Sequence, residues 1–400
     1  MQHITRRRCE GAAMGLISLE LKPGLGLGPF SLGMPICEAI ANIEQDTSNY
    51  DVVQVKYYDE EPLMFDIVIN FPDLGFQLRF EPCSQRLRLI DVFDVKTLQM
   101  RYGNSFIGGP NTATFAAVYQ ACGPTYPGSY DADRGIYTLF YPGLSFAFPI
   151  PPQYEYCVDQ QAELPLEFPN GTTPVTSRIC IYDKSSGGSV GVGASLNKAI
   201  LPPLPVGSLY MEEVHAKLAD ELWFSVGGQH LPFGASPQDV WSELGRPCEI
   251  HQKQVDQMVI HNASDTSPRT TLCGDYFYNY FTRGIDILFD SQSHKIKKFV
   301  LHTNFPGHAD FNSYIKCNFV IHCPRSDTQK DAANTYEHYI TPNTKWDQVQ
   351  ELLGDGGRAA IQTQGSTTNP FGSTLVYGYQ NIAFEVMKNG HIATVTLFQS

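Results

Sequence analysis

Apolar residues alternate with other residues in four short stretches of the chain, and each stretch follows a segment whose apolar residues have helical spacing. The apolar triplets are Leu74, Phe76 and Leu78; Leu144, Phe146 and Phe148; Ile285, Ile287 and Phe289; and Ile382, Phe384 and Val386. Side chains two positions apart lie on the same face of a strand, so each triplet gives an apolar sheet face that needs a cover. The preceding helix supplies that cover. The pattern predicts an α+β fold of four repeats, each a helix followed by an antiparallel meander.

The predicted helices have recognisable ends. They span about residues 35–43, 112–122, 236–244 and 344–353, and a glycine follows the last three, at Gly123, Gly245 and Gly354. At the start of the third helix, Ser236 and Asp239 have the spacing of a capping box. Glycine is the residue that most readily takes the conformation required just after a helix. The helix boundaries are therefore predicted from local chemistry as well as from periodicity.

Two tryptophans fall in these helices. Trp241 lies in the third helix and Trp346 in the fourth, at related places before the closing glycine. A large aromatic side chain on a short helix is usually part of the core. We expect both indoles to be buried, and the alternative is that one exposed tryptophan anchors a partner.

The order of the elements divides the chain into two halves. Residues 14–183 are predicted to form an N-terminal half with repeats one and two, and residues 209–400 a C-terminal half with repeats three and four. Gly, Ser and Pro are frequent between them, so residues 184–208 are predicted to be a linker. Residues 1–13 contain three arginines but no apolar core of a secretory signal, and they are predicted to be a disordered extension.

A further helix is predicted at the start of the C-terminal half. Ser208 can cap it, and Tyr210, Val214, Leu218 and Leu222 recur every four residues. Apolar residues four apart lie on one face of a helix. We expect this amphipathic helix to precede repeat three.

The composition indicates a folded, β-rich protein with an acidic balance. Hydrophobic residues make up 42% and aromatic residues 12% of the chain, and charged residues only 17%, compared with roughly 25% in ordinary globular chains. The formal net charge of −13 argues against binding nucleic acid through a broad basic surface. No stretch reaches the roughly 18 apolar residues of a membrane span, so no transmembrane segment is expected.

Cysteine usage indicates a reducing compartment. The ten cysteines are scattered along the chain, and no two of them form a CxxC pair. With no export signal predicted, we expect free thiols and a cytoplasmic protein.

Candidate chemistry is sparse. The densest group of possible metal ligands is His302, His308, Cys317, His322 and Cys323. Imidazole and thiolate suit zinc, but this spacing fits no zinc finger and structural roles are expected. The glycine-rich stretch 191–195 lacks the lysine of a phosphate loop, and no local pattern joins a nucleophile to a base. The sequence predicts no catalytic residue, no cofactor and no metal.

Two neighbouring stretches are the strongest candidates for binding. Lys295, Lys297 and Lys298 form a short basic stretch that could meet a phosphoinositide head group, or could protect an edge strand. The next stretch contains Asn304, Phe305, Pro306, His308 and Phe311, which no repeat requires. An aromatic loop outside the sheet pattern is a candidate partner contact, and the alternative is that it covers an open edge of the core.

Several segments resemble the phagosome assembly factor family, from about residue 19 to the C-terminus. They are PFSLGMPICEAI (29–40), QRLRLIDV (85–92), GLSFAF (143–148), YFYNYFTRGIDILFD (276–290), HKIKKFVLHTNFPGH (294–308), KWDQVQELLG (345–354) and NPFGSTLVYG (369–378). Residues before about 14 and residues 184–228 depart from the family pattern.

This resemblance implies a non-enzymatic regulator of autophagy. It implies a complex with a WD-repeat β-propeller protein, the breast-carcinoma-amplified sequence protein, and recruitment to preautophagosomal structures. Contact with the autophagic membrane would be made mainly by the propeller. A fold-level resemblance alone would not license this, because one fold hosts many functions.

Two other functions stay open at the level of sequence. A lipid- or phosphoinositide-binding module would use apolar space between helices and sheets, and would need a cavity of several hundred cubic ångströms. A hydrolase would need Cys, His and Asp or Asn side chains to converge in one cleft. No spacing along the chain points to such a convergence.

Overall fold

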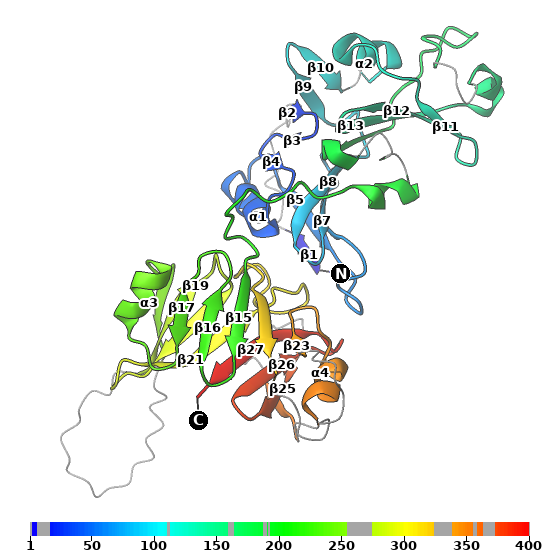
Figure 1. The fold of residues 1–400 in the computed structure, drawn as a ribbon. Coiled ribbons are helices and arrows are strands. Elements are labelled where there is room, and N and C mark those ends of the chain that lie inside the picture. Colours follow the sequence, from blue (N-terminus) through cyan, green and yellow to red (C-terminus); the bar gives the residue numbers. More distant parts are fainter. Residues whose placement is uncertain are drawn as a thin grey trace, which may run out of the picture. The chain divides into compact units, whose positions relative to one another are not determined.

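The structure is a computed structural model that describes residues 2–5, 17–109, 113–158, 164–186, 190, 193–253, 274–323, 338–354, 358–362 and 373–399. It divides into two compact units, an N-terminal unit that ends at Leu204 and a C-terminal unit that begins at Pro205 (Figure 1). Among the described residues, no helix has the length and apolar character needed to cross a membrane.

The described residues of the N-terminal unit form two sheets and two α-helices. Its elements are β1 (Gln2–Thr5), β2 (Ser18–Lys22), β3 (Gly26–Leu27), β4 (Phe30–Ser31), α1 (Ile36–Gln45), β5 (Val52–Lys56), β6 (Ile67–Phe71), β7 (Phe76–Glu81), β8 (Arg86–Val92), β9 (Gln99–Tyr102), β10 (Ser105–Gly108), α2 (Phe115–Cys122), β11 (Ser129–Asp131), β12 (Ile136–Tyr141), β13 (Leu144–Pro149) and β14 (Arg178–Tyr182). The larger sheet has the order β1-β5-β6-β7-β8-β14-β13-β12-β11, and the smaller has the order β10-β9-β2-β3-β4.

The C-terminal unit is built in the same way. Its elements are β15 (Glu213–Lys217), β16 (Glu221–Phe224), β17 (His230–Pro232), α3 (Pro237–Leu244), β18 (Glu249–Gln252), β19 (Tyr276–Tyr280), β20 (Ile285–Phe289), β21 (Ile296–His302), β22 (Asn318–His322), β23 (Tyr339–Ile340), α4 (Trp346–Leu353), β24 (Ala360–Gln362), β25 (Thr374–Tyr379), β26 (Ile382–Val386) and β27 (Ile392–Phe398). The larger sheet has the order β18-β19-β20-β21-β27-β26-β25-β24, and the smaller has the order β17-β16-β15-β22-β23.

The two units repeat one topology. From β2 to β14 and from β15 to β27, helices and strands follow in the same order and take the same places in their sheets. In each unit the last strands of two meanders pair antiparallel, β8 with β14 and β21 with β27, and one pair in each small sheet is parallel, β2 with β9 and β15 with β22. The predicted α+β fold of four helix-and-meander repeats in two halves is confirmed.

The predicted apolar faces form the cores. All residues of the four triplets are less than 10% exposed. In the C-terminal unit the triplets pack with the inner face of the small sheet, represented by Val214 and Phe224, and with Val240 of α3 and Val349 of α4. Figure 1 shows β15, β16 and β17 in front of the larger sheet, with α3 and α4 on opposite sides. The larger sheet is therefore covered by a second sheet as well as by helices.

The helix ends follow the expected chemistry. The residues after α2, α3 and α4 are Gly123, Gly245 and Gly354, with φ of 79°, 78° and 82°. Each donates its N–H to the carbonyl four residues earlier, at 2.8–2.9 Å. A side chain would be strained at this φ, which explains glycine at all three positions. The carboxylate of Asp239 accepts the N–H of Ser236 at 2.8 Å, so the predicted capping box is present.

The helix predicted after Ser208 is wrong, because this region forms β15 and β16. Val214, Ala216, Leu222 and Phe224 are buried and alternate with residues that are half-buried or exposed. A spacing of four residues satisfies a strand period of two as well as a helical period, so the apolar pattern was ambiguous. Parallel pairing with β22 decides in favour of the strand.

Residues 184–208 are more than a linker. Val190, Leu196 and Ala199 are buried with Leu89, Cys180 and Tyr182, on the face of the larger sheet opposite the triplets. The hydroxyl of Ser145 donates to the Val190 carbonyl at 2.7 Å, and the Arg86 guanidinium donates to the Pro202 carbonyl at 2.9 Å. This segment therefore covers the second face of the N-terminal sheet.

Part of the predicted N-terminal extension is a strand. Residues Gln2–Thr5 of this extension form β1, which pairs antiparallel with β5, and the rest of the extension lies outside the described residues.

The two helix tryptophans differ in burial. Trp346 is 7% exposed, but Trp241 is 47% exposed, so the expectation that Trp241 is buried is wrong. Trp346 is the first residue of α4 and shares its buried stripe with Val349 and Leu353, whereas Trp241 follows buried Val240 and is turned toward solvent.

Candidate functional site

The three candidate lysines lie at the start of a central strand. β21 is paired with β20 on one side and β27 on the other, so the edge-strand interpretation is wrong. The ammonium group of Lys297 lies 3.1 Å from Asp275 and 3.5 Å from Asp290. Lys298 lies over the ring of Phe398, 5.9 Å from its centroid, and Lys295 is exposed. The local acids balance much of this basic stretch.

The loop after β21 is packed inside the C-terminal unit. The Thr303 hydroxyl donates to the carbonyls of Ile392 and Ala393, both at 2.8 Å. Asn304, at φ 53°, accepts the N–H of Asn312 at 2.7 Å. These bonds fix the loop to the first residues of β27 and to its own returning end.

The aromatic residues of this loop are largely covered. Phe305 is 1% exposed and its ring lies 5.1 Å from that of His391, with the Lys316 ammonium 5.2 Å from its centroid. Pro306 is buried, and Phe311 is half-buried. The loop closes one end of the core, so Phe305 and Pro306 are not surface contacts of the chain by itself. Partner contact by Phe311 stays a prediction.

His308 makes the strongest polar contact of the loop. Its Nε2 lies 3.2 Å from Oε1 of Glu385 on β26, and both residues are less than 10% exposed. Glu385 also accepts hydrogen bonds from the hydroxyls of Thr374 at 2.7 Å and Thr394 at 2.8 Å. Burial lowers the pKa of His308, but the hydrogen bond and charge of Glu385 outweigh this and raise it above its ordinary value. Burial raises the pKa of Glu385, yet His308 and Thr374 bring it down to about 2.

We expect the free energy of unfolding of the C-terminal unit to fall as the pH rises above the ordinary histidine pKa of about 6.5. A raised pKa for His308 means that its stabilising effect is complete below the ordinary value of about 6.5 and is lost as the pH rises through the folded-state value. Native-state hydrogen exchange of the amides of β26 and β27 at pH values on both sides of about 6.5 reports the C-terminal unit by itself, in the wild type and in His308→Gln, which cannot gain the charge. The two proteins should differ in their dependence on pH; parallel curves would contradict the ion pair.

A second buried polar group lies on the outer face of the same sheet. Asp286 accepts the Tyr314 hydroxyl at 2.9 Å and the Asn279 amide at 2.7 Å, and it lies 2.9 Å from His302 Nε2. The rings of His302 and Tyr314 are stacked, with centroids 3.7 Å apart. Burial, and then the charge of Asp286, raise the pKa of Tyr314. A carboxylate with this many partners fixes the segment that carries Tyr314 over the sheet.

The predicted metal-ligand candidates do not form a site. In the described part of the chain, no three His, Cys, Asp or Glu side chains are grouped so that they could hold a metal ion. His302 is paired with Asp286, and His308 is paired with Glu385. Burial raises the pKa of Cys317, and it raises that of Cys323 to about 11. Both thiols are protonated at neutral pH, which disfavours nucleophilic or metal chemistry.

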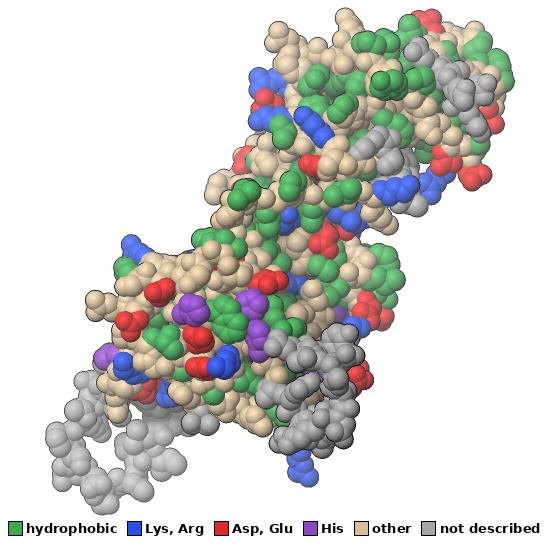
Figure 2. Space-filling view, viewed as in Figure 1, with side chains coloured by type: hydrophobic (Ala, Val, Ile, Leu, Met, Phe, Trp, Pro, Cys, Tyr) green, Lys and Arg blue, Asp and Glu red, His purple; other side chains and the backbone are tan. Residues whose placement is uncertain are grey.

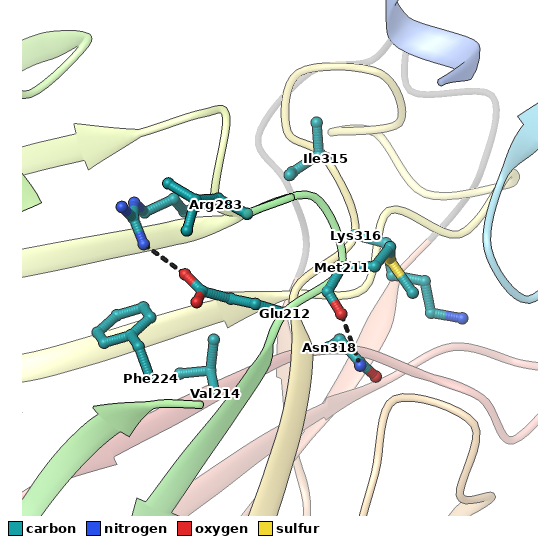
Figure 3. Close-up of a pocket in the computed structure, with 9 residues that line it drawn as sticks. Met211, Glu212, Val214, Phe224, Arg283, Ile315, Lys316 and Asn318 are labelled. Carbon is teal, nitrogen blue, oxygen red and sulfur yellow. Dashed lines mark hydrogen bonds and ion pairs between the residues drawn. The ribbon is translucent and has the colours of Figure 1, made fainter. Parts of the chain in front are cut away.

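A small pocket opens where β15 begins (Figure 3). It is lined by Leu209, Met211, Glu212, Val214, Phe224, Arg283, Ile315, Lys316 and Asn318. Arg283 donates to Glu212 at 2.7 Å, and its guanidinium lies over Phe224, 5.2 Å from the ring centroid. The cavity measures about 10 Å³, which is room for about one water molecule. This pocket is too small for a lipid and gives no support to the lipid-binding alternative.

Sequence reasoning missed the Glu212–Arg283 pair. Glu212 is 7% exposed and also accepts the N–H of Gly227 at 3.2 Å. It precedes β15 in the small sheet, whereas Arg283 is in the turn between β19 and β20 of the larger sheet. The ion pair therefore joins the two layers of the unit, and 71 residues of sequence separate its members. No local pattern could have signalled it.

Comparisons with known proteins identify relatives along nearly the whole chain. A family model described as phagosome assembly factor 1 matches residues 26–398. A PHAF1 protein of Arabidopsis thaliana is 70% identical over 397 residues, which cover 99% of this chain and 96% of that protein. A PHAF1 protein of Drosophila melanogaster is 36% identical, with 96% and 95% covered, and one of Caenorhabditis elegans is 30% identical, with 99% and 98% covered. No solved structure matches the chain.

Proposed function

Because this chain belongs to the phagosome assembly factor 1 family, we propose that it regulates autophagy by binding another protein and not by catalysis. The proposed partner is a WD-repeat β-propeller protein of the breast-carcinoma-amplified sequence family. The complex acts at the site where autophagosomes form. The chain itself is cytoplasmic, is recruited to preautophagosomal structures, and reaches the membrane mainly through the propeller.

The observation that supports binding over catalysis is how the titratable side chains are used. In the C-terminal unit, Asp286, Glu385 and Glu212 each have two or more described partners and are less than 10% exposed. A carboxylate used in general acid or base catalysis has to reach a substrate. These three carboxylates are instead committed to connecting layers of the fold, which is what a rigid binding scaffold needs.

Co-purification tests the proposal. The full chain and the WD-repeat protein, expressed together, are expected to co-elute in size-exclusion chromatography after affinity capture of either chain. A WD-repeat propeller of an unrelated complex serves as the control and should not be captured. Both chains folded, soluble and repeatedly found apart would contradict the proposal.

A further inference from the structure

Four aromatic rings are grouped on the outer face of the small sheet of the C-terminal unit, three of them in mutual contact and the fourth against one of these. Trp223 of β16 is stacked on His215 of β15, with centroids 4.9 Å apart and planes at 8°. His322 of β22 lies 5.4 Å from His215 and 5.0 Å from Trp223. Tyr339 of β23 meets His322 edge-on at 5.0 Å. We call these four residues the ring ridge.

The ring ridge is on the surface. Along β15, β16, β22 and β23 the residues that point to the core are buried, and the ridge residues alternate with them. Tyr339 is 40% exposed, and the other three rings are half-buried. In Figure 2, histidine side chains gather over β15 and β16 of this unit, beside apolar and acidic side chains.

The fold does not require these rings. In the N-terminal unit, β2 takes the place of β15, and its outer face carries the exposed ion pair of Glu20 and Lys22, at 3.1 Å. On the paired strand β9, Arg101 is exposed. The same sheet is thus built with an ordinary charged surface in one unit and with the ring ridge in the other. A feature that the shared architecture can do without is a candidate for function.

Polar contacts hold the two imidazoles of the ridge in place. His215 Nδ1 lies 3.1 Å from His322 Nε2, and His215 Nε2 lies 3.4 Å from a carboxylate oxygen of Glu213. These contacts hold the two imidazole rings in place beside Trp223, where they present aromatic surface to a partner.

The surroundings of the ridge are acidic. Glu213, Asp220 and Glu221 lie around it, and Lys217, which pairs with Asp220, is the one lysine among these flanking residues of β15 and β16. The side chain of Glu213 is 56% exposed. Aromatic rings bordered by carboxylates attract a cation, and an arginine is the best match because its planar guanidinium can stack on a ring while its N–H groups pair with a carboxylate.

We propose that the ring ridge is a docking surface for a protein segment that presents an arginine side chain. The inference rests on the proposed function, because it assigns the partner-binding role to one face of the molecule. The guanidinium stacks against Trp223 and the neighbouring imidazoles and pairs with Glu213, because Glu221 already lies 3.1 Å from His230 Nδ1. Trp, Tyr and Arg are enriched among the residues that carry most of the binding energy of protein interfaces.

Two variants and a matched control test the ridge in the full chain. Trp223→Ala removes one ring of the ridge, and Glu213→Lys reverses the charge that would meet the arginine. Glu20→Lys makes the same reversal on the equivalent face of the N-terminal unit. Circular dichroism and thermal unfolding confirm that each variant is folded. With the co-purified WD-repeat partner, the first two variants are expected to raise the Kd by about tenfold or more, and the control to leave it unchanged.

A peptide arm tests the ridge without the partner. A fluorescently labelled nona-arginine peptide is expected to bind the wild type more tightly than nona-lysine does, and to lose that advantage in Trp223→Ala. If no complex with the WD-repeat partner exists, the proposed function fails and the peptide arm alone decides the ridge. If the complex forms and both ridge variants bind as the wild type does, the docking surface is overturned while the proposed function stands. An equal loss in Glu20→Lys would also overturn it.

Discussion

Replacing Asp91 by alanine is expected to destabilise the N-terminal unit by about 3–5 kcal/mol, the cost of breaking a buried ion pair by removing one partner. Asp91 on β8 is 0% exposed. Its carboxylate accepts hydrogen bonds from two N–H groups of the Arg178 guanidinium, one of them at 2.6 Å, and one from the side-chain amide of Gln77 at 2.7 Å. Arg178 is on β14, so the pair crosses the junction at which the two meanders of the unit meet. Without Asp91, a cation and an amide are left unpaired beside the sheet.

Because the chain has two compact units, a single melting curve would average them. Hydrogen exchange of the amides of β8 and β14 under native conditions reports the N-terminal unit by itself. Asp73→Ala, at an exposed turn position, is the control and should stay within about 0.5 kcal/mol of the wild type.

A double variant separates the ion pair from the space that it fills. Replacing Asp91 by leucine and Arg178 by methionine removes both charges together, and this should recover much of the lost stability, because no unpaired charge is left behind and only the half-buried Gln77 amide loses its partner. A cost of under about 1 kcal/mol for Asp91→Ala would show that the pair does not hold the junction.

The sequence predicted the elements whose signals are local. The triplets, the capping box at Ser236 and the three closing glycines each depend on residues a few positions apart, and the structure confirms them. The small sheets were missed. β3 and β4 have two residues each, which is too short for any periodic pattern, and β15 has an apolar spacing that a helix would share.

The candidate site depended on contacts that the sequence does not display. The loop with Phe305 resembled an exposed aromatic segment because the strand that covers it comes about 90 residues later, as the bond from Thr303 to Ala393 shows. The ring ridge was invisible for the same reason, since His215 and His322 are 107 residues apart. Side chains from distant strands come together only through the pairing of those strands, and no local rule specifies that pairing.

Replacing Trp346 by alanine is expected to destabilise the C-terminal unit by about 3–5 kcal/mol. Its indole is stacked on Tyr377 of β25, with centroids 4.2 Å apart, and is tilted against Phe384 of β26 at 5.6 Å. It therefore joins α4 to two strands of the larger sheet. Removing it leaves a cavity that the rigid sheet can close only in part.

The repeated architecture supplies the matched control for this substitution. Trp241 is also a tryptophan, on α3, which is the corresponding helix of the preceding repeat, but its position in the helix differs and it is 47% exposed. Trp241→Ala should change the free energy of unfolding by about 0.5 kcal/mol or less, because little packing is lost. Chemical denaturation of both variants, followed by hydrogen exchange of β25 and β26, measures the difference. Equal costs for the two would mean that the faces of α3 and α4 are assigned wrongly, whereas a large cost for Trp346 alone shows that position on the helix, and not the tryptophan itself, determines its role.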